Sequence, residues 1–573
     1  MKAKRYFGIH LDPPAEGGSD NVTESAIVRL LEAARADFLQ VTVKGKDGVL
    51  LYPDSAVSAS AGGTVKDAIA LYRKVARKAN IPLFASVSAG ADALAAHEHP
   101  DWAAVGADGA AHPFSMGLNS KYVRDRLIPQ MKEIIDRYRP DGFWLDLDCE
   151  AVVADHSKHN LQRFQKAAGS DTPPTSPDDP RWAAWMELHR RDLVRRVQTY
   201  ADAVHAHAPG IALVSNGLYS RHCPLPKNSV PTDHVSSSLS ATAHAVNEAR
   251  LDARVLASTG AAWDCAIVAT TIDGERGRSP STLHKTARQI CQEAAILLSQ
   301  GGGVSLRCAA ERGGDIPEHV IATVRDVSDF CRQRQRFCDE TATVPQVAVL
   351  LPGAQGLLCA ALDAGHSVDI ITDFQLAERA FDYPAILLPA HGDMTDETFL
   401  RLKEYVERGG SLLVTGDAQT KRWGDALGLA LTEDAQPCQK GRIAAIAEPL
   451  GERYAATRDP ALRERLAAAL KPLYLPTVSI LSRDGGYIDL TLRRRGKALV
   501  LHLVNLNNAP TPFAPLADRI PAVGPVKLLV RNQPLPKKAT CEPEGLPLKV
   551  EPSGRNFTLT LPRLHLHAAI ALS

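Results

Sequence analysis

The sequence predicts an α/β protein made of a (β/α)8 TIM barrel, a flavodoxin-like α/β domain and a C-terminal antiparallel β-sandwich. Three observations support this. Short apolar runs alternate with longer amphipathic runs up to about residue 335, and the same rhythm restarts near residue 340. After about residue 475 the helical pattern stops, and polar and apolar residues alternate. We therefore expect three domains, at residues 1–338, 339–475 and 476–573.

The first segment shows the strand and helix rhythm of a barrel. Strands separated by helices are parallel and joined by right-handed crossovers. Seven candidate strands are visible, which suits an eight-stranded barrel with one strand missed, and a doubly wound sheet is the alternative. The expected strands are 6–11, 38–43, 83–87, 142–146, 212–215, 255–258 and 303–306. The expected helices include 24–36, 65–79, 122–138, 182–208 and 283–299.

The two later domains have different patterns. Between residues 340 and 475, four apolar runs such as VPQVAVLLP and GGSLLVTG alternate with helical segments, which is typical of a flavodoxin-like sheet. No cysteine stands at a strand-to-helix turn in this part, so we interpret it as structural and expect it to form an oligomer interface. The turn RRGK within YIDLTLRRRGKALVLHLVN then predicts a hairpin of the terminal sandwich.

Composition excludes several classes of protein. The 573 residues carry a formal net charge of +1, so neither nucleic acid nor an anionic membrane is an expected partner. Ten cysteines without a C-x-x-C pair argue against a disulfide framework or a zinc ribbon and favour a reducing compartment. We find no secretory signal and no apolar run of about 18 residues, and expect a cytoplasmic protein that needs no metal or other cofactor.

The most informative segment is RYRPDGFWLDLDCE at 137–150. A Pro-Asp-Gly turn leads into an apolar strand that ends in acidic residues, and in a parallel barrel the carboxyl ends of the strands form the reactive rim. Asp146 and Asp148 would project into this mouth, with Trp144 on the same side of the strand as Asp146. A carboxylate beside an indole suits sugar chemistry. The alternative is an aspartate that caps the following loop.

This segment resembles the Y-x-P-D-x-x-W-x-D element of the α-L-fucosidases of glycoside hydrolase families 29 and 151. The resemblance implies that Asp146 is the nucleophile. The stretch WDCAIVATTIDGERG at 263–277 is similar to the W-E-x-C stretch of these families, whose acid/base glutamate falls on Asp264. GIHLDPP and FLQVTVKGKDGVLLYP resemble the family's first strand and its Lys-His-His-Asp-Gly segment. The stretch at 381–416 is similar to the trimerisation domain of family 42 β-galactosidases, an amidotransferase-like fold.

The departures from the family pattern affect both specificity and acid/base chemistry. Gly45-Lys46-Asp47-Gly48 stands where the fucosidases carry paired histidines, so sugar contacts would differ. Asp264 is one methylene shorter than the family's glutamate, which shifts the carboxyl by about 1.5 Å. Asp273, Glu275 and Glu150 are the alternative acids. Sugar contacts are expected from His10, Lys44, Lys46, Trp144, Asp148, Asn216 and Trp263.

The resemblance therefore implies a retaining exo-glycosidase, α-L-fucosidase-like, that acts by double displacement on a terminal sugar. Its catalytic residues would be Asp146 and one of Asp264, Glu275 and Asp273. One alternative is a catalytically silent carbohydrate-binding or scaffold protein on a glycosidase fold. Another is a glycosidase for a different sugar such as a galactoside. The expected partners are a carbohydrate substrate and further copies of the chain, as a trimer or a dimer.

Overall fold

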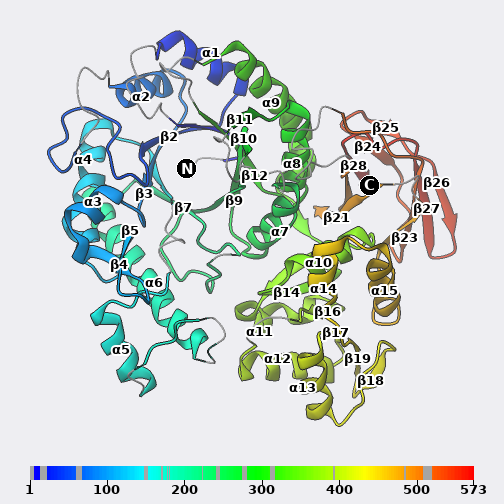
Figure 1. Ribbon diagram of the computed structural model, residues 1–573. Helices are drawn as coiled ribbons and strands as arrows, with labels where there is room; N and C mark the ends of the chain where they lie inside the picture. Colours follow the sequence, from blue (N-terminus) through cyan, green and yellow to red (C-terminus); the bar gives the residue numbers. More distant parts are fainter. Residues whose placement is uncertain are drawn as a thin grey trace. The chain divides into compact units, whose positions relative to one another are not determined.

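Figure 1 shows the computed structural model of the chain. It describes residues 5–12, 22–59, 67–146, 153–169, 172–176, 179, 181–221, 223–240, 245–273, 281–309, 316–390, 394–482, 486–507 and 519–573. The chain divides into two compact units that interleave along the sequence. The first unit comprises Met1–Ser238, Ala261–Ala269 and Val304–Ser328, and the second comprises Leu239–Gly260, Thr270–Gly303 and Asp329–Ser573. The predicted boundaries after residues 338 and 475 stay a prediction.

Eight parallel strands close into a barrel, which confirms the predicted fold class of the N-terminal part (Figure 1). In the order of the barrel the strands are β1, β12, β9, β8, β7, β6, β3 and β2, with β2 paired to β1. Their bounds are β1 (Phe7–Asp12), β2 (Phe38–Lys44), β3 (Leu83–Ser88), β6 (Gly142–Asp146), β7 (Ala212–Asn216), β8 (His234–Ser238), β9 (Trp263–Val268) and β12 (Gly303–Ala309).

One predicted strand is wrong. Residues 255–258 form the last turn of helix α7 (Ala245–Ser258), and the strands on either side of that helix are β8 and β9, which the pattern missed. The apolar run VLAS belongs to a helix buried on nearly all sides, where three-residue and four-residue spacing is hard to see. The serine-rich β8, HVSSS, lacks the apolar residues that mark a strand.

Helices follow most of the barrel strands. Thr23 caps α1, since its side chain accepts a hydrogen bond from the backbone N–H of Ala26, and the helix buries one apolar face. The helices of the first unit are α1 (Glu24–Ala34), α2 (Ala68–Lys78), α3 (Ala93–Glu98), α4 (Ile128–Tyr138), α5 (Lys158–Ala168) and α6 (Trp182–His207). A hairpin of β4 (Ala103–Val105) and β5 (Ala111–Met116) follows α3, and α9 (Glu318–Cys338) follows β12.

Aromatic side chains fill the barrel interior. Phe38, Phe84, Trp144 and Val214 form one buried cluster. The neighbouring strands carry glycine where these rings need room: a Cβ on Gly8 would lie 2.2 Å from the Phe38 ring. The barrel interior is therefore a packed core and not a pore.

The second unit contains a doubly wound parallel sheet with the order β15, β14, β16, β17, β19, β18. Apart from the antiparallel edge strand β18, this is the 2-1-3-4-5 order of flavodoxin-like folds, as predicted. Apolar clusters cover both faces of the sheet. The strands are β14 (Val347–Leu351), β15 (Val368–Thr372), β16 (Ala385–Leu388), β17 (Ser411–Thr415), β18 (Gln436–Cys438) and β19 (Gly441–Ile446). The helices are α10 (Gln355–Asp363), α11 (Leu376–Arg379), α12 (Asp396–Glu407), α13 (Asp417–Leu427), α14 (Leu450–Thr457) and α15 (Pro460–Leu470).

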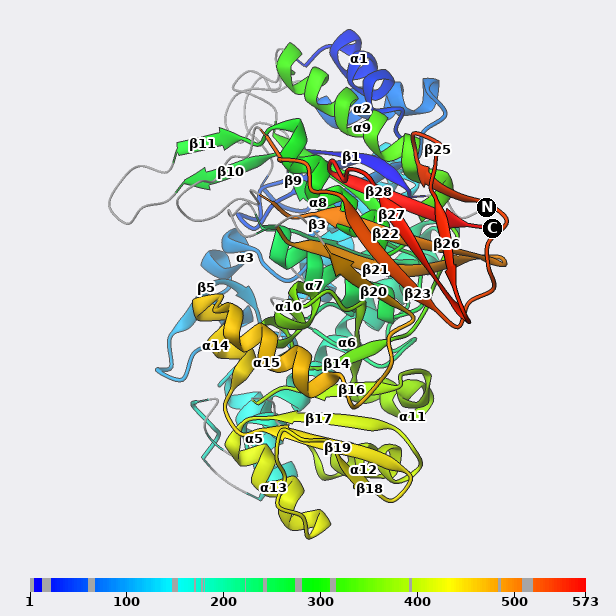
Figure 2. The same ribbon diagram turned by 90° about the vertical axis from the view of Figure 1, so that its right-hand side faces the viewer.

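The predicted C-terminal sandwich is present, with two antiparallel sheets around one apolar core (Figure 2). The first sheet has the order β13 (Ala342–Thr343), β21 (Ile488–Arg495), β22 (Ala498–Asn505), β28 (His567–Leu572), β24 (Ala539–Glu542) and β25 (Leu546–Pro547). The second has the order β20 (Val478–Ser482), β23 (Val526–Arg531), β27 (Asn556–Leu561) and β26 (Val550–Ser553). The predicted turn RRGK joins β21 to β22.

The described residues contain neither a disulfide nor a helix that could span a membrane. The nine cysteines in the described part of the chain are buried, and none of them is in a disulfide. Over the same residues, no helix combines the length and the apolar character needed to cross a membrane.

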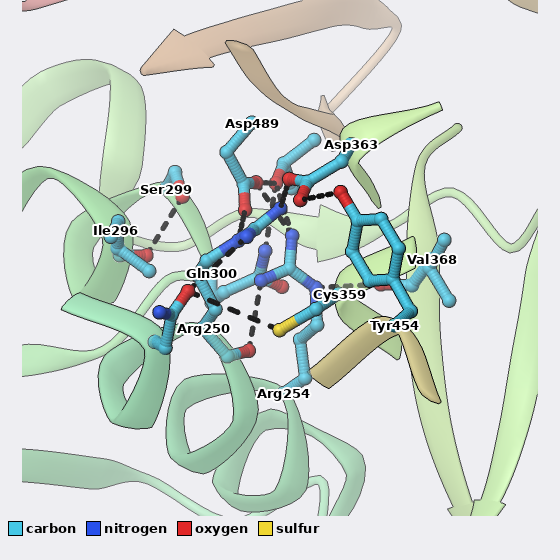
Figure 3. A network of polar contacts seen from close by, with 12 residues as sticks. Arg250, Arg254, Ile296, Ser299, Gln300, Cys359, Asp363, Val368, Tyr454 and Asp489 are labelled. Atoms are coloured by element: carbon cyan, nitrogen blue, oxygen red, sulfur yellow. Dashed lines mark hydrogen bonds and ion pairs between the residues drawn. The ribbon is translucent and has the colours of Figure 1, made fainter. Parts of the chain in front are cut away.

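A buried polar network joins four elements of the second unit (Figure 3). On α7, Arg250 donates to Asp363 of α10 at 2.7 Å and to Asp489 of β21 at 3.1 Å. Arg254 donates to the other oxygen of Asp489 at 2.6 Å. Tyr454 of α14 donates to Asp363 at 2.7 Å. Because each buried charge has a partner of opposite sign, α7 is fixed to both the α/β sheet and the sandwich.

We expect Asp489→Asn to lower the free energy of unfolding by about 3–5 kcal/mol, because two buried guanidinium groups would lose their shared counter-charge. Burial raises the pKa of Asp489, but Arg254 and Arg250 outweigh it, so the pKa is lowered. The stabilisation is then complete above about pH 4 and is lost as pH falls below that value. Urea denaturation followed by circular dichroism measures both effects.

The matched control is Glu404→Gln on α12, which removes an exposed partner of Arg408. It should change the free energy of unfolding by less than about 0.5 kcal/mol. An effect of Asp489→Asn as small as this control would show that the network contributes little to stability.

Candidate active site

Four polar side chains from four strands meet near one rim of the barrel. Asp146, Asn216 and Asp12 are the final residues of β6, β7 and β1, and Arg307 lies near the end of β12. All eight strands are parallel, so their carboxyl ends share one rim. Asp146 therefore has the position that the sequence predicted, at the end of the fourth barrel strand along the chain.

Asp146 has an organised polar environment. The Asn216 side-chain amide donates to Oδ1 of Asp146 at 2.7 Å. Nη1 of Arg307 lies 4.0 Å from Oδ2 of the same carboxylate. The side chain of Asp146 is 18% exposed, so it is accessible to solvent. A carboxylate that is held on one oxygen and faced by a guanidinium on the other can act as a nucleophile or a stabilising charge.

Arg307 is fixed by Asp12. Its Nε donates to Oδ2 of Asp12 at 2.7 Å, and its Nη2 donates to Oδ1 at 3.0 Å. Asp12 and Arg307 are 28% and 26% exposed, so both reach the mouth. Burial alone would raise the pKa of Asp12, but His10 and Arg307 outweigh it and lower the pKa. Asp12 is therefore an ionised partner of Arg307 and a poor proton donor.

His10 lies fully buried below this pair and does not reach the mouth. The Gln40 amide nitrogen lies 2.9 Å from Nδ1 of His10, so Nδ1 accepts and the proton resides on Nε2. Nε2 then donates to Thr42 at 3.0 Å, and Thr42 donates to Asp12 at 2.7 Å. Burial, followed by the charge of Arg307, lowers the pKa of His10 to about 3. The predicted sugar contact of His10 does not fit this position.

Trp144 also differs from its predicted role. Its ring is 1% exposed and belongs to the aromatic cluster inside the barrel. The indole N–H donates to Ser236 at 3.0 Å, and the ring meets His10 edge to face. Trp144 is therefore part of the barrel core below the rim, because alternation places it on the inward face one layer deeper than Asp146.

The two predicted lysine contacts have different surroundings. Lys44 ends β2 but is buried, and its ammonium donates to Asp92, Tyr122 and Gln130 at 3.1, 2.6 and 3.2 Å. These bonds use all three of its protons, so Lys44 has no donor left for a sugar. Lys46 is exposed, with its ammonium 5.8 Å from the centre of the Phe114 ring. Its role in sugar binding stays a prediction.

The prediction that Asp264 is the acid/base does not fit the structure. Asp264 and Trp263 begin β9, so they lie toward the amino ends of the strands, whereas Asp146 ends its strand. Asp264 is fully buried, and Arg5 holds its Oδ2 with contacts of 2.9 and 2.8 Å from Nε and Nη2. It is a structural counter-charge inside the barrel, and Trp263 is likewise buried.

The remaining candidates are only partly described. Asp148, Glu150 and Glu275 lie outside the described residues. Asp273 is the last residue of β10 (Thr270–Asp273), which pairs with β11 (Ser281–His284), and only its backbone is described. β10 begins directly after the carboxyl end of β9.

Sequence reasoning missed Asp12 and Arg307. Asp12 lies in the strand sequence GIHLD, and Arg307 lies in GVSLRCA. A charged residue on the inward side of an otherwise apolar strand is unusual, and this could have marked both as candidate site residues. No group of three or more His, Cys, Asp and Glu among the described side chains is placed to hold a metal ion.

A family model described as "Hypothetical glycosyl hydrolase 6" matches residues 23–147, a segment that includes β6 and Asp146. No curated protein matches the chain.

Solved glycosidases share the complete fold. Alpha-L-fucosidase isoenzyme 2 from Paenibacillus thiaminolyticus superposes with a TM-score of 0.79 at 16% identity, covering 100% of both chains. The beta-galactosidase from Bacillus circulans sp. alkalophilus gives 0.67 at 13% identity, covering 100% of this chain and 99% of its own. The beta-galactosidase from Rahnella sp. R3 gives 0.64 at 13% identity, covering 100% and 98%.

These matches confirm, at the level of fold, the resemblance that the sequence predicted. The chain has a glycoside-hydrolase-like fold related to those of α-L-fucosidases and β-galactosidases. At such low identity the likeness defines the architecture and not the substrate.

We expect His10 to remain neutral between about pH 4 and 8, whereas an unperturbed histidine titrates near pH 6.5. The folded state then binds fewer protons than the unfolded state, so this contribution to stability is complete above about pH 6.5 and declines toward pH 3. Nitrogen-15 NMR of the imidazole, assigned with His10→Gln, measures the titration. A midpoint near 6.5 would contradict the buried neutral ring.

Proposed function

We propose that the protein is a retaining exo-glycosidase, α-L-fucosidase-like, with Asp146 as its nucleophile. The observation that carries the proposal is the partly exposed Asp146 at the rim, held by Asn216 and faced by Arg307. An α-L-fucoside is the first candidate substrate, and a β-D-galactoside is the second, because solved enzymes with these two activities share the fold. The chemistry requires no cofactor.

In this mechanism a carboxylate oxygen of Asp146 attacks the anomeric carbon, and the bond to the leaving oxygen breaks. A carboxylic acid protonates that oxygen, so the products of this step are the free aglycone and a covalent glycosyl-enzyme. The same acid, now a carboxylate, removes a proton from water, which displaces Asp146 with net retention. The hydrogen bond from Asn216 to Oδ1 of Asp146 would orient the carboxylate for the attack on the anomeric carbon.

We propose that the acid/base is Asp273 or Glu275, with Glu150 as an alternative. The first two follow the carboxyl end of β9 along the chain, and Glu150 follows that of β6. The chain therefore leaves the reactive rim shortly before each of them. Asp264 itself, which the resemblance to the fucosidases implied as the acid/base, is buried against Arg5, and this supports the choice of the other acids.

The second candidate function is a catalytically silent carbohydrate-binding protein. It is favoured by Gly45-Lys46-Asp47-Gly48 in place of paired histidines and by the position of Asp264. We further propose that residues 339–475 mediate association into a dimer or trimer, supported by exposed Phe374, Phe381 and Leu400 in that segment.

Asp146→Asn should reduce kcat/KM for 4-nitrophenyl glycosides on the order of 10⁴-fold, because the amide keeps the shape of the side chain but is not a nucleophile. The substrates are the α-L-fucoside, the β-D-galactoside and further aryl glycosides. Asp148→Asn is the control, with a loss below about tenfold. Equal losses in both variants would leave Asp146 without a distinct role, and no turnover by the wild type would favour the silent binding protein.

The acid/base is identified by azide rescue of Asp273→Ala, Glu275→Ala and Glu150→Ala. The variant that lacks the true acid/base should still release a good leaving group, and azide should restore its rate because it needs no general base. The product should be a glycosyl azide of retained configuration, which NMR detects. Asp264→Asn is the comparison variant and should show no azide product. Rescue of that variant would restore Asp264 as the acid/base.

A further inference from the structure

The contacts between Asp12 and Arg307 determine how closely Arg307 approaches the carboxylate of Asp146. Three nitrogens of the Arg307 guanidinium face the two carboxylates at the rim. Nε and Nη2 bond Asp12 at 2.7 and 3.0 Å, and Nη1 stops 4.0 Å from Oδ2 of Asp146. Charge-assisted hydrogen bonds are usually about 2.7–2.9 Å long, so a separation of 4.0 Å is too long for one. Arg307 therefore faces Asp146 as a charge and does not hydrogen-bond it.

Asp12 is itself firmly placed. Its Oδ1 accepts from Thr42 on β2, and Thr42 is in turn held by His10 within the same barrel. Asp12 and Arg307 lie on the paired strands β1 and β12, two residues apart in register, so their side chains leave the same face of the sheet. The pairing of β1 with β12 brings the two side chains together, and the hydrogen bonds from His10 through Thr42 fix the carboxylate of Asp12. Both constraints support the bidentate contact with Arg307.

A direct bond from Arg307 would harm a nucleophilic carboxylate. It would occupy a lone pair of Oδ2 and stabilise the ground state more than the transition state, in which Asp146 loses its charge. At 4.0 Å the guanidinium still places a positive charge beside the carboxylate of Asp146. The distance between the two groups therefore matters for the reaction.

We propose that Asp12 is a positioning residue that holds Arg307 out of hydrogen-bond contact with Asp146. This inference rests on the proposed function for its catalytic consequence, but the geometry can be tested without activity. Asp12→Asn removes the charge that holds the guanidinium, which then moves to Asp146. Arg307→Gln removes the guanidinium, so the position of residue 12 no longer matters.

The kinetic test is a double-mutant cycle on kcat/KM with an aryl glycoside that the wild type hydrolyses. We expect about a 100-fold loss for Asp12→Asn and about a tenfold loss for Arg307→Gln. The double variant should be about tenfold more active than Asp12→Asn alone. A double variant that loses about 1000-fold, the product of the single losses, would overturn the proposal. The same changes in the exposed pair Asp396 and Arg422 should leave kcat/KM unchanged.

Thermal unfolding gives a readout that does not depend on catalysis. In the wild type, Asp146→Asn removes no hydrogen bond from Arg307. In the Asp12→Asn background it removes a new ion pair, so the loss in Tm should be larger by about 2–4 °C. Equal losses in both backgrounds would overturn the proposal. A larger loss in the Asp12→Asn background, combined with a wild type that hydrolyses no glycoside, would retain the geometry and reject the glycosidase function.

Discussion

The closed ring of eight parallel strands is the constraint on which the candidate site depends. Parallel strands in a closed barrel have one direction, so every strand ends at the same rim. This brings together Asp12 and Arg307, which are 295 residues apart in the chain, and places them beside Asp146 and Asn216. No local motif could do so, because each of the four side chains comes from a different strand.

The rim rests on a polar chain that runs down inside the barrel. Asp264 binds Arg5, Arg5 binds Gln40, and Gln40 binds His10. Thr42 then connects His10 to Asp12. Inside a packed interior such a chain is stable only when its members are paired, and pairing makes it rigid. The carboxylate that clamps Arg307 is therefore anchored from below.

The sequence predicted the barrel, the flavodoxin-like sheet, the sandwich and the position of Asp146, because a turn followed by an apolar strand defines the direction of β6. It failed for residues 255–258, where a buried helix lacks visible periodicity. It also failed for Asp264 and Trp144: alternation reveals that a side chain points inward, but not its height along the barrel axis. That height depends on where each strand begins, which is a property of the closed ring. Asp12 and Arg307 were missed because their pairing spans the first and last strands.

The interleaving of the two units affects the order in which the protein can form during synthesis. Helix α7 lies between barrel strands β8 and β9 in the chain, yet its two buried arginines find their carboxylate partners only at Asp363 and Asp489. A ribosome releases those partners more than a hundred residues after the helix. Until then Arg250 and Arg254 lack these partners, so a nascent chain cut off at residue 338 would contain all eight barrel strands but leave the arginines of α7 without Asp363 and Asp489. Helix α7 is therefore expected to reach its final packing only after Asp489 has been synthesised.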